Sequence, residues 1–251
     1  MIKFFRKIRQ NLLSEGKTTK YFKYAIGEII LVVIGILIAL QINNWNENRQ
    51  KRSLEGDYLT EIKENLVRDT VNINSVMQFQ IQKIDSIKET LILFKQAEND
   101  LPYFASLEQK LPVLASHYDF EPVKTAFDNM VSSEKISLIS NKKLRAELSS
   151  YYSEYSYKKL SQERLLGLTR KFVDDIVPKI MFKETINAMV GVELNMASSS
   201  EINIHKDEEV ISNLFLMNLL CRSVHAELTN KKEVIVTLIA QIETEKITQN
   251  D

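Results

Sequence analysis

The sequence predicts an all-α protein in which one N-terminal transmembrane helix continues into an elongated, extracytoplasmic antiparallel bundle of three long helices plus short helices. Three observations lead to this prediction. The 251 residues include only 6 Gly and 4 Pro, too few for a turn-dense β-sandwich. Residues 24–42 form an apolar stretch with a single charge. Three later stretches without proline repeat apolar residues at helical spacing, at residues 54–98, 142–177 and 207–248.

The predicted transmembrane helix, residues 24–42, is long enough to cross a bilayer. As an α-helix it would span roughly 28 Å, close to the thickness of the hydrocarbon core. Tyr24 stands at its start, and Trp45, the single Trp, follows its end. On one helix they would lie about 31 Å apart, which suits rings at the two membrane interfaces. We therefore predict Tyr24 and Trp45 as interface anchors.

The uninterrupted apolar core, residues 29–40, also has the length of the hydrophobic region of a signal peptide. Cleavage would need small residues at both recognition positions beyond that region. With Ala39 in the last position, the earlier one is Leu37, and no other small residue occurs before Ser53. The sequence therefore favours an uncleaved signal anchor.

The charge on the two sides of the apolar stretch predicts its orientation. Residues 1–23 carry seven basic residues and one acidic residue, a net charge of +6, whereas residues 47–251 carry 26 basic and 31 acidic residues, a net charge of −5. The positive-inside rule then places the N-terminus in the cytoplasm and residues 43–251 outside it, as an extracytoplasmic helical-bundle domain. The whole-chain charge of zero gives no nucleic-acid footprint, so we expect no nucleic-acid partner.

Residues 1–23 form a basic cytoplasmic segment. Within them, Ile2, Phe5, Ile8 and Leu12 recur at steps of three and four residues between basic side chains. This pattern is typical of a short amphipathic helix on an anionic membrane surface. A flexible charged tail that only sets the topology fits the same residues, and both interpretations stay open.

One face of the predicted span carries Glu28, Gly35 and Ala39, at steps of seven and four residues. Gly35 and Ala39 form a small-xxx-small pair, which lets a second helix approach closely. A carboxylate inside a membrane indicates a functional or partner contact. We predict helix–helix association through this face, in a homo-oligomer or with a partner membrane protein. The alternative is an interfacial Glu28 paired with Lys23 or lipid amines, and a glycine that is merely tolerated.

The first long helix, residues 54–98, is expected to continue the transmembrane helix outward, because nothing between the two must break the helix. Its apolar residues recur at spacings near 3.5, as in an amphipathic helix or a coiled-coil strand. They are Leu59, Ile62, Leu66, Ile73, Val76, Ile84, Ile87, Leu91 and Phe94. Pro102, Pro112 and Pro122 then predict loops and short helices.

A short helix at residues 123–131 and a turn at residues 132–135 precede the second long helix, residues 142–177. Ser140 or Asn141 can serve as its N-cap, because both side chains accept main-chain hydrogen bonds. Its expected core positions are Leu144, Leu148, Tyr151, Tyr155, Leu166 and Phe172.

We expect the second helix to end just before Pro178, since proline disfavours a helical residue before it. The third long helix, residues 207–248, begins with three acidic residues, which the helix dipole favours. Its expected core stripe is Val210, Leu214, Met217, Leu220 or Cys221, Val224, Leu228, Ile235, Leu238 and Ile242.

The N-terminal stretch resembles the opening of a known family. Residues 4–47, with the core GEIxLVxIGILIALQINNW, look very like a family of uncharacterised bacterial single-pass membrane proteins, catalogued as a domain of unknown function. YLTEIKENL at residues 58–66 and FDNMVSSEKISLISNKKLRAELSSYY at residues 127–152 resemble later segments of that family. There a Gly usually follows the serine pair, where this chain has Glu134. The resemblance implies a single pass through the bacterial cytoplasmic (inner) membrane, with the bulk of the chain periplasmic, and it implies no activity.

No motif in the sequence supports catalysis or a cofactor. HExxH, CxxC, EF-hand, G-x-S-x-G and Gly-rich phosphate-loop spacings do not occur, so we predict a non-enzyme without cofactor or metal. His117 and His205 stand beside carboxylates and are the residues that a metal site would use. Cys221 follows two leucines and is expected in the core. Tyr151 and Tyr155 are expected to pack in the bundle with their hydroxyls at its rim; the alternative is an aromatic platform for a sugar or partner.

Two non-enzymatic functions fit these features. The first is a membrane-anchored interaction or scaffold subunit that assembles through its span and its bundle. The second is an extracytoplasmic ligand-sensing helical domain that signals through a partner membrane protein, because residues 1–23 are too few for an output domain. We place the interaction subunit first. A pocket between the long helices with convergent polar groups would favour the sensor.

Overall fold

The computed structural model describes residues 18–96, 106–157, 160–180, 190–192, 195 and 204–250. Most of the basic segment at residues 1–23, namely residues 1–17, lies outside the described residues, so its predicted amphipathic helix is not tested. The chain divides into two compact units, Met1–Gly56 and Asp57–Asp251. Throughout the described ranges the regular structure is helical and contains no strand, which confirms the all-α prediction.

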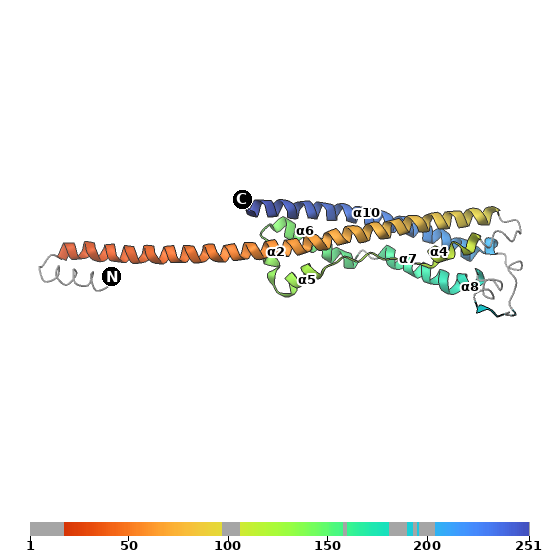
Figure 1. Ribbon diagram of the computed structural model, residues 1–251, viewed down its shortest axis with the longest axis horizontal. Coiled ribbons are helices and arrows are strands. Elements are labelled where there is room, and N and C mark those ends of the chain that lie inside the picture. The colour runs from red at the N-terminus through yellow and green to blue at the C-terminus, as the bar shows by residue number, and fades with distance from the viewer. Residues whose placement is uncertain are drawn as a thin grey trace. The chain divides into compact units, whose positions relative to one another are not determined.

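The described α-helices, all labelled in Figure 1, are α2 (Thr18–Gln96), α4 (Leu111–Ala115), α5 (Thr125–Ser132), α6 (Lys142–Tyr157), α7 (Leu160–Lys171), α8 (Val177–Ile180) and α10 (Glu208–Asn250). Two 3-10 turns, η1 (Lys135–Leu138) and η4 (Ile204–Lys206), and one π-helical turn, η2 (Phe172–Ile176), complete the described elements.

Unit 1 is described from Thr18 onward, where it consists of the first part of α2. Its apolar side chains between residues 29 and 40 are all exposed, from 47 % for Val33 to 63 % for Ile29. Among the described residues, α2 is the one helix long and apolar enough to cross a membrane, with a mean hydropathy of 2.6 in its most apolar 18-residue window. Length and composition alone fit a signal sequence as well as an anchor.

In unit 2, contacts between side chains fix the direction of each long helix. The Tyr151 hydroxyl on α6 donates to Asp69 on α2 at 2.7 Å, and Lys83 on α2 donates to Thr169 on α7 at 3.0 Å. Residue numbers therefore increase together along both partners, which makes α6 and α7 parallel to this part of α2. The prediction of an antiparallel bundle is wrong for this pair.

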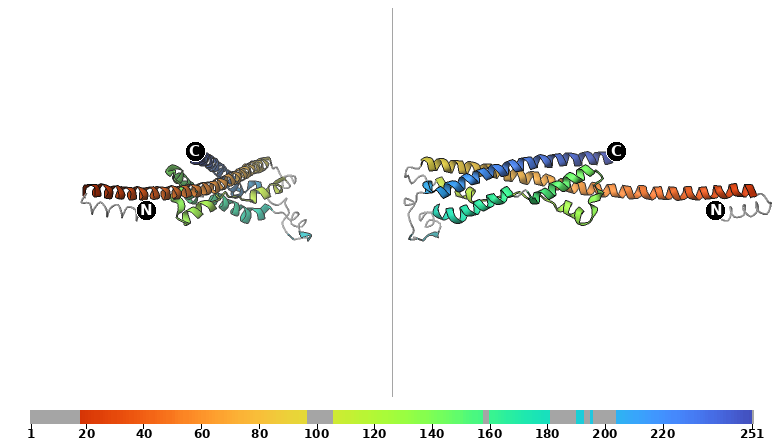
Figure 2. Two further views of the ribbon diagram at one scale, coloured as in Figure 1. Left: turned by 60° about the vertical axis from the view of Figure 1, so that its left-hand side comes forward. Right: turned by 180° about the vertical axis from the view of Figure 1, so that it is seen from behind.

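The last helix, α10, runs antiparallel to the other two. Lys63 near the start of the unit 2 part of α2 pairs with Glu243 near the end of α10 at 2.6 Å. Further along α2, the Ile84 carbonyl accepts a hydrogen bond from Asn218 at 3.5 Å. The antiparallel prediction holds for α10 (Figures 1 and 2).

A parallel pair needs a return path, and residues 116–124 provide it. We call these residues the strap; they have no regular secondary structure and run back along α2. Ser116 contacts Lys83, and Val123 contacts Asp69, so residue numbers rise along the strap as they fall along α2. Proline explains why the return is not a fourth long helix, since Pro122 cannot donate a helical hydrogen bond.

The core of α2 follows an unbroken heptad register. Apart from Asn65, its buried positions alternate steps of three and four residues from Leu59 to Phe94. Seven of the nine predicted apolar positions are buried, and Ile84 and Leu91 pack partly buried beside them. Four buried polar residues fill the places in that register that the apolar prediction left out: Asp69, Gln80, Lys83 and Thr90.

The stripe of α10 agrees with the prediction at every position, with Cys221 rather than Leu220 fully buried. On the second helix the prediction is wrong at one place, because Leu165 is fully buried and Leu166 is not. Tyr155 lies in α6, but its side chain is outside the described set.

Of the two candidates for the cap of the second helix, the structure selects Asn141, and it shows a further cap at Asp207 that was not predicted. Asn141 Oδ1 accepts the main-chain N–H groups of Lys143 and Leu144, both at 3.1 Å, and caps α6. Asp207 Oδ1 likewise accepts the N–H groups two and three residues further on, at 3.0 and 3.2 Å, and caps α10. Each side chain satisfies two of the donors that a helix start leaves unpaired.

Pro178 does not end the second helical region, contrary to the prediction. It lies inside α8, directly after the π-helical turn η2, where the Val177 N–H donates to the Phe172 carbonyl five residues earlier. A proline ring crowds the carbonyl four residues before it and lacks an N–H. The wider π-turn at that place accommodates the ring, so the helix continues.

The turn after α5 places Glu134 in the left-handed region, with φ 59°. It is the single non-glycine residue with positive φ among those described. A Cβ atom strains this conformation, whereas glycine adopts it freely. This strain gives a physical reason for the glycine expected there from the family pattern.

Candidate functional site: a groove between α6, α7 and α10

The predicted association face lies in the exposed part of α2. Gly35 and Ala39 are exposed and Glu28 is half-buried. A Cβ atom built on Gly35 would meet no heavy atom within 4 Å, so the helix has open space above this residue. At Gly35 the face is therefore open to the approach of a second helix.

Of the two predicted anchors, Trp45 is 65 % exposed, with the Arg49 guanidinium 5.9 Å from its ring centroid. Tyr24 lies in α2 as expected, but its side chain is outside the described set. The geometry of Trp45 suits an aromatic ring beside a polar membrane surface.

A groove of about 1000 Å³ opens on unit 2 where α6 ends and α7 begins, with α10 as its third wall. Its floor is apolar and consists of the buried residues Val224, Leu228 and Leu238. Leu160 and Val234, both exposed, form apolar parts of its rim. A volume of this size lies at the upper end of small-molecule sites, which run from about 300 to 1,000 Å³. The sequence did not predict this groove.

The Glu227 carboxylate in the groove accepts hydrogen bonds from two serine hydroxyls. Its Oε1 accepts a short hydrogen bond from Ser161 on α7 and a second, of 3.1 Å, from Ser223 one turn earlier on α10. The two hydroxyls lie 3.3 Å apart. Among the described residues, no lysine or arginine forms an ion pair with Glu227. The carboxylate is therefore fixed in place while its charge is left without a cation.

Lys231 lies one turn from Glu227 but faces a different group. Its Nζ is 5.6 Å from the centroid of the Tyr151 ring, a cation–π arrangement. Tyr151 in turn donates to Asp69; burial raises the pKa of that carboxyl, and the charge of Lys231 partly opposes the rise. The Tyr151 hydroxyl thus points into the bundle, and the prediction that it lies at the rim is wrong.

Asp69 is fully buried and binds two donors, the Tyr151 hydroxyl and the Val123 N–H of the strap, each at 2.7 Å. Burial raises its pKa from 3.8 to about 6, against the opposing effect of these hydrogen bonds. Tyr152, stacked on Phe127 at 4.5 Å between centroids, has its pKa raised well above its usual range by burial and by the nearby Asp69. Asp69 therefore anchors the strap to α6 from one side of the core.

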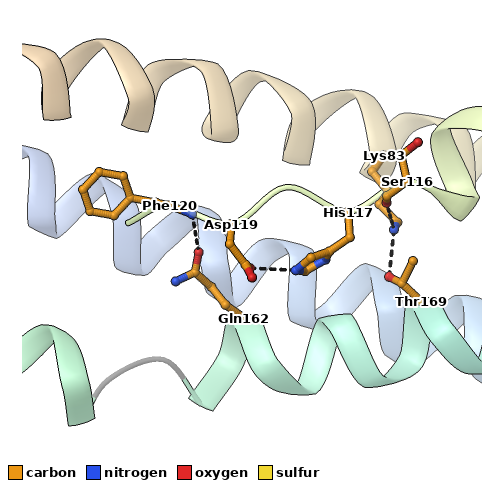
Figure 3. A network of polar contacts seen from close by, with 7 residues as sticks. All are labelled: Lys83, Ser116, His117, Asp119, Phe120, Gln162 and Thr169. Carbon is orange, nitrogen blue, oxygen red and sulfur yellow. Dashed lines mark hydrogen bonds and ion pairs between the residues drawn. The ribbon is translucent and has the colours of Figure 1, made fainter. Parts of the chain in front are cut away.

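The strap is held at two further points, shown in Figure 3. The Lys83 ammonium donates to the Ser116 carbonyl at 2.7 Å, and Gln162 on α7 accepts the Phe120 N–H at 2.8 Å. Buried main-chain groups need such partners, because an unpaired one costs about as much as a lost hydrogen bond. Asp69, Lys83 and Gln162 each supply one, which explains why these polar residues occupy core positions.

Lys83 carries the largest fully buried side chain of the described residues. Burial lowers the pKa of its ammonium from 10.5 to about 8, with a smaller opposing effect of the Cys221 thiol. Burial also raises the pKa of Cys221 to about 11. Cys221 is therefore a neutral core thiol near neutral pH, as predicted.

His117 lies on the strap and pairs with Asp119 at 2.6 Å, as Figure 3 shows. Burial lowers its pKa, against the opposing effect of Asp119, and Lys83 and Arg170 lower it further. The neutral ring is therefore favoured. Within the ranges that the structure describes, no group of three His, Cys, Asp or Glu side chains could hold a metal ion.

The comparisons with known proteins agree with the resemblance drawn from the sequence. The model of a family described as "Family of unknown function (DUF6090)" matches residues 28–219, from the exposed part of α2 into α10. No curated protein and no solved structure matches the chain. Because the match covers well over half of the chain, the protein belongs to the DUF6090 family.

Proposed function

We propose that the protein is a membrane-anchored, non-enzymatic interaction or scaffold subunit. The observation that carries this proposal is the exposed apolar stretch of α2, with open space above Gly35. An exposed apolar run of this length is costly in water and is covered by lipid or by another helix. The charge difference across the stretch supports a cytoplasmic N-terminus, with the bulk of the chain periplasmic to the bacterial inner membrane.

The proposed contact is the face of Glu28, Gly35 and Ala39, in a homo-oligomer or with a partner membrane protein. Small residues permit close helix contact, and a carboxylate in a membrane is stabilised by a partner's hydrogen-bond donor. The partners are thus the bilayer and a second helix.

Cross-linking in intact membranes, followed by extraction and mass spectrometry of the tagged chain, tests the contact. Gly35→Leu should abolish a cross-linked oligomer or companion, because the larger side chain separates the helices. Gly27→Leu is the matched control: a Cβ atom there also meets no heavy atom within 4 Å, but the residue lies off the proposed face. Equal cross-linking of the two variants would show that this face is not an interface.

Reporter fusions after Glu15 and after Asp251 test the orientation. We expect a cytoplasmic reporter to be active at the first position and a periplasmic reporter at the second. Cytoplasmic activity of the C-terminal fusion would overturn the proposed topology.

Ligand sensing is a second candidate, favoured by the groove between α6, α7 and α10. Apolar floor residues and polar groups converge there, as in small-molecule sites. A sensor of this design would pass its signal through a partner membrane protein. A ligand that changes the cross-linked partner of the full chain in membranes would support sensing over a purely structural subunit.

A further inference from the structure

We infer that the groove between α6, α7 and α10 binds a small amphipathic amine, with its apolar body against Leu160 and Val234 and its cationic head at Glu227. This inference goes beyond the proposed interaction subunit and does not depend on it. It rests on three observations from unit 2: the charges of the described residues that line the groove, the hydrogen bonds that hold Glu227, and the exposed apolar side chains beside it.

The charged groups of the groove favour a cation. Among the described residues that line it are three carboxylates, Glu147, Glu227 and Glu233, and one ammonium, that of Lys231. That ammonium already lies against the Tyr151 ring and near Asp69. An anionic ligand would meet the excess of carboxylates, so charge complementarity points to a positively charged ligand.

Glu227 is prepared to receive that charge. Two serine hydroxyls bind its Oε1 from two different helices, which fixes the carboxylate before any ligand arrives. Its other oxygen, Oε2, has no hydrogen-bond or ion-pair partner among the described residues. A carboxylate fixed beside apolar surface is stabilised by a charge-assisted hydrogen bond, which is stronger than one between neutral groups. An ammonium or guanidinium group supplies the donors that such a bond needs.

Apolar residues beside Glu227 favour a ligand with a hydrophobic part. Val224 and Leu228 lie one turn apart on α10, on either side of Glu227 in sequence, and both are almost fully buried by the protein. Leu160 and Val234 extend apolar surface to the rim. A ligand with an apolar body removes the exposed side chains of Leu160 and Val234 from water, whereas a small polar cation would not. The chemistry that fits is therefore an amine attached to a hydrophobic chain or ring.

A binding experiment on the full chain in phosphatidylcholine nanodiscs tests this inference, with 2-(1-naphthyl)ethylamine as the probe. The matched acid 1-naphthylacetate and the matched alcohol 2-(1-naphthyl)ethanol separate charge from hydrophobicity. Equilibrium dialysis against empty nanodiscs subtracts partition into lipid. We expect saturable binding of the amine, and binding of the acid and the alcohol at least about tenfold weaker, which is about 1.4 kcal/mol.

Two variants locate the site. Glu227→Gln keeps an acceptor for both serines but removes the charge, and it should weaken amine binding about tenfold or more. Asn230→Trp places a large side chain in the groove from an exposed position and should weaken binding without touching the core. Glu163→Gln is the matched control, since it removes one exposed carboxylate from α7 outside the groove and should leave binding unchanged.

Three results would each overturn the inference: no saturable amine binding above empty nanodiscs, equal affinity of the wild type and Glu227→Gln, or an acid that binds as tightly as the amine. The Asn230→Trp variant keeps the test decisive if Glu227→Gln lowers stability. Loss of cross-linked partners in membranes would bear on the proposed interaction subunit alone, so the two proposals fail separately.

Discussion

The substitution Lys83→Met tests what the buried ammonium that binds the strap contributes to the free energy of unfolding. Methionine has a similar length and fills the same space, but it carries neither a charge nor a donor. The Ser116 carbonyl and the Thr169 hydroxyl would each lose one hydrogen bond. In return, the protein would no longer bury an ammonium in the core.

The magnitude follows from the pKa of Lys83. Burial lowers it from 10.5 to about 8, so the folded protein releases this proton more easily than the unfolded chain. A difference of about 2.5 pKa units corresponds to roughly 3 kcal/mol. The sign is that of a depressed pKa: the stabilising contribution is fully present above pH 10.5 and is lost as the pH falls through 8. The wild type should therefore gain about 3 kcal/mol relative to Lys83→Met between pH 7 and pH 10.5.

The difference between the two proteins is the informative quantity, because other lysines and tyrosines titrate in the same range. Two titratable groups face Lys83. Cys221 on α10 has a raised pKa of about 11 and stays neutral over most of the range from pH 7 to pH 10.5, and His117, whose pKa is lowered, is neutral in that range. At pH 7 the wild type and Lys83→Met should be close in stability. The variant loses the hydrogen bonds of a charged donor, but it no longer buries an ammonium, and the two effects offset each other.

Urea unfolding followed by far-UV circular dichroism, on the full chain in detergent at several pH values, measures this difference. Fluorescence would not report on it, because the single Trp, Trp45, belongs to unit 1. Lys88→Met, an exposed lysine on the same helix, controls for the removal of a lysine in general. A wild-type advantage over Lys83→Met that stays constant within about 1 kcal/mol from pH 7 to 10.5 would refute the reasoning.

Three further predictions use the same unfolding assay. Because the pKa of Asp69 is raised to about 6, its contribution to the free energy of unfolding is present below pH 3.8 and should be lost as the pH rises to 6, by about 3 kcal/mol. Asp69→Asn should remove this dependence of the unfolding free energy on pH. An unchanged pH dependence in that variant would contradict the raised pKa. Leu165→Ala should cost about 2–5 kcal/mol and Leu166→Ala clearly less, and the reverse order would show that α7 is rotated. Glu134→Gly should stabilise the protein by about 1 kcal/mol by relieving its positive φ, so a loss of stability would contradict the left-handed turn.

Local features of the fold could be predicted from the sequence because they depend on neighbours along the chain. The stripes of α2 and α10 follow from apolar spacing alone, and the cap at Asn141 follows from a short polar side chain before a helical stretch. Leu165 was missed because it stands beside another leucine, Leu166, and helical spacing alone does not decide which of two adjacent apolar residues faces the core.

The parallel arrangement of α2 and α6–α7 could not be predicted in this way. Helix direction depends on the path of the connection, and three prolines were expected to make loops rather than a strap that crosses back along α2. One signal was available: the apolar stripe of α2 skips Asp69 and Lys83, although both stand in register with it. Polar residues at such positions indicate that a partner other than a helix side chain lies opposite.

The groove could not be predicted either, because its walls are assembled from distant parts of the chain. Ser161 and Glu227 are 66 residues apart and belong to different helices. Their contact depends on the register between α7 and α10, which no local pattern fixes. Neither residue type, taken singly, indicates a binding site.

The buried polar residues of α2 explain how that register is set. An apolar heptad seam alone would permit a helix to shift by one heptad at little cost, since one apolar layer replaces another. Asp69 and Lys83 disfavour the shift, because both are fully buried and each binds one main-chain group of the strap. Asp69 accepts the Val123 N–H, and Lys83 donates to the Ser116 carbonyl. A shifted strap would leave a carboxyl and an ammonium buried without partners, at a cost of several kcal/mol for each.

The same residues also bind the second helical region, since Asp69 accepts from Tyr151 on α6 and Lys83 donates to Thr169 on α7. These two contacts hold α6 and α7 in one position along α2. The position of α7 in turn determines which of its residues face α10, so Ser161 lies opposite Glu227. The polar core thus has a consequence outside the core: a variant that frees the strap should also loosen the hydroxyl contacts of Glu227. In Lys83→Ala, which removes both the charge and the volume, amine affinity at the groove should fall together with stability. Lys83→Met keeps the packing but loses the same two hydrogen bonds, to Ser116 and Thr169, so its amine affinity should also fall. Unchanged amine binding in Lys83→Met would disprove the coupling.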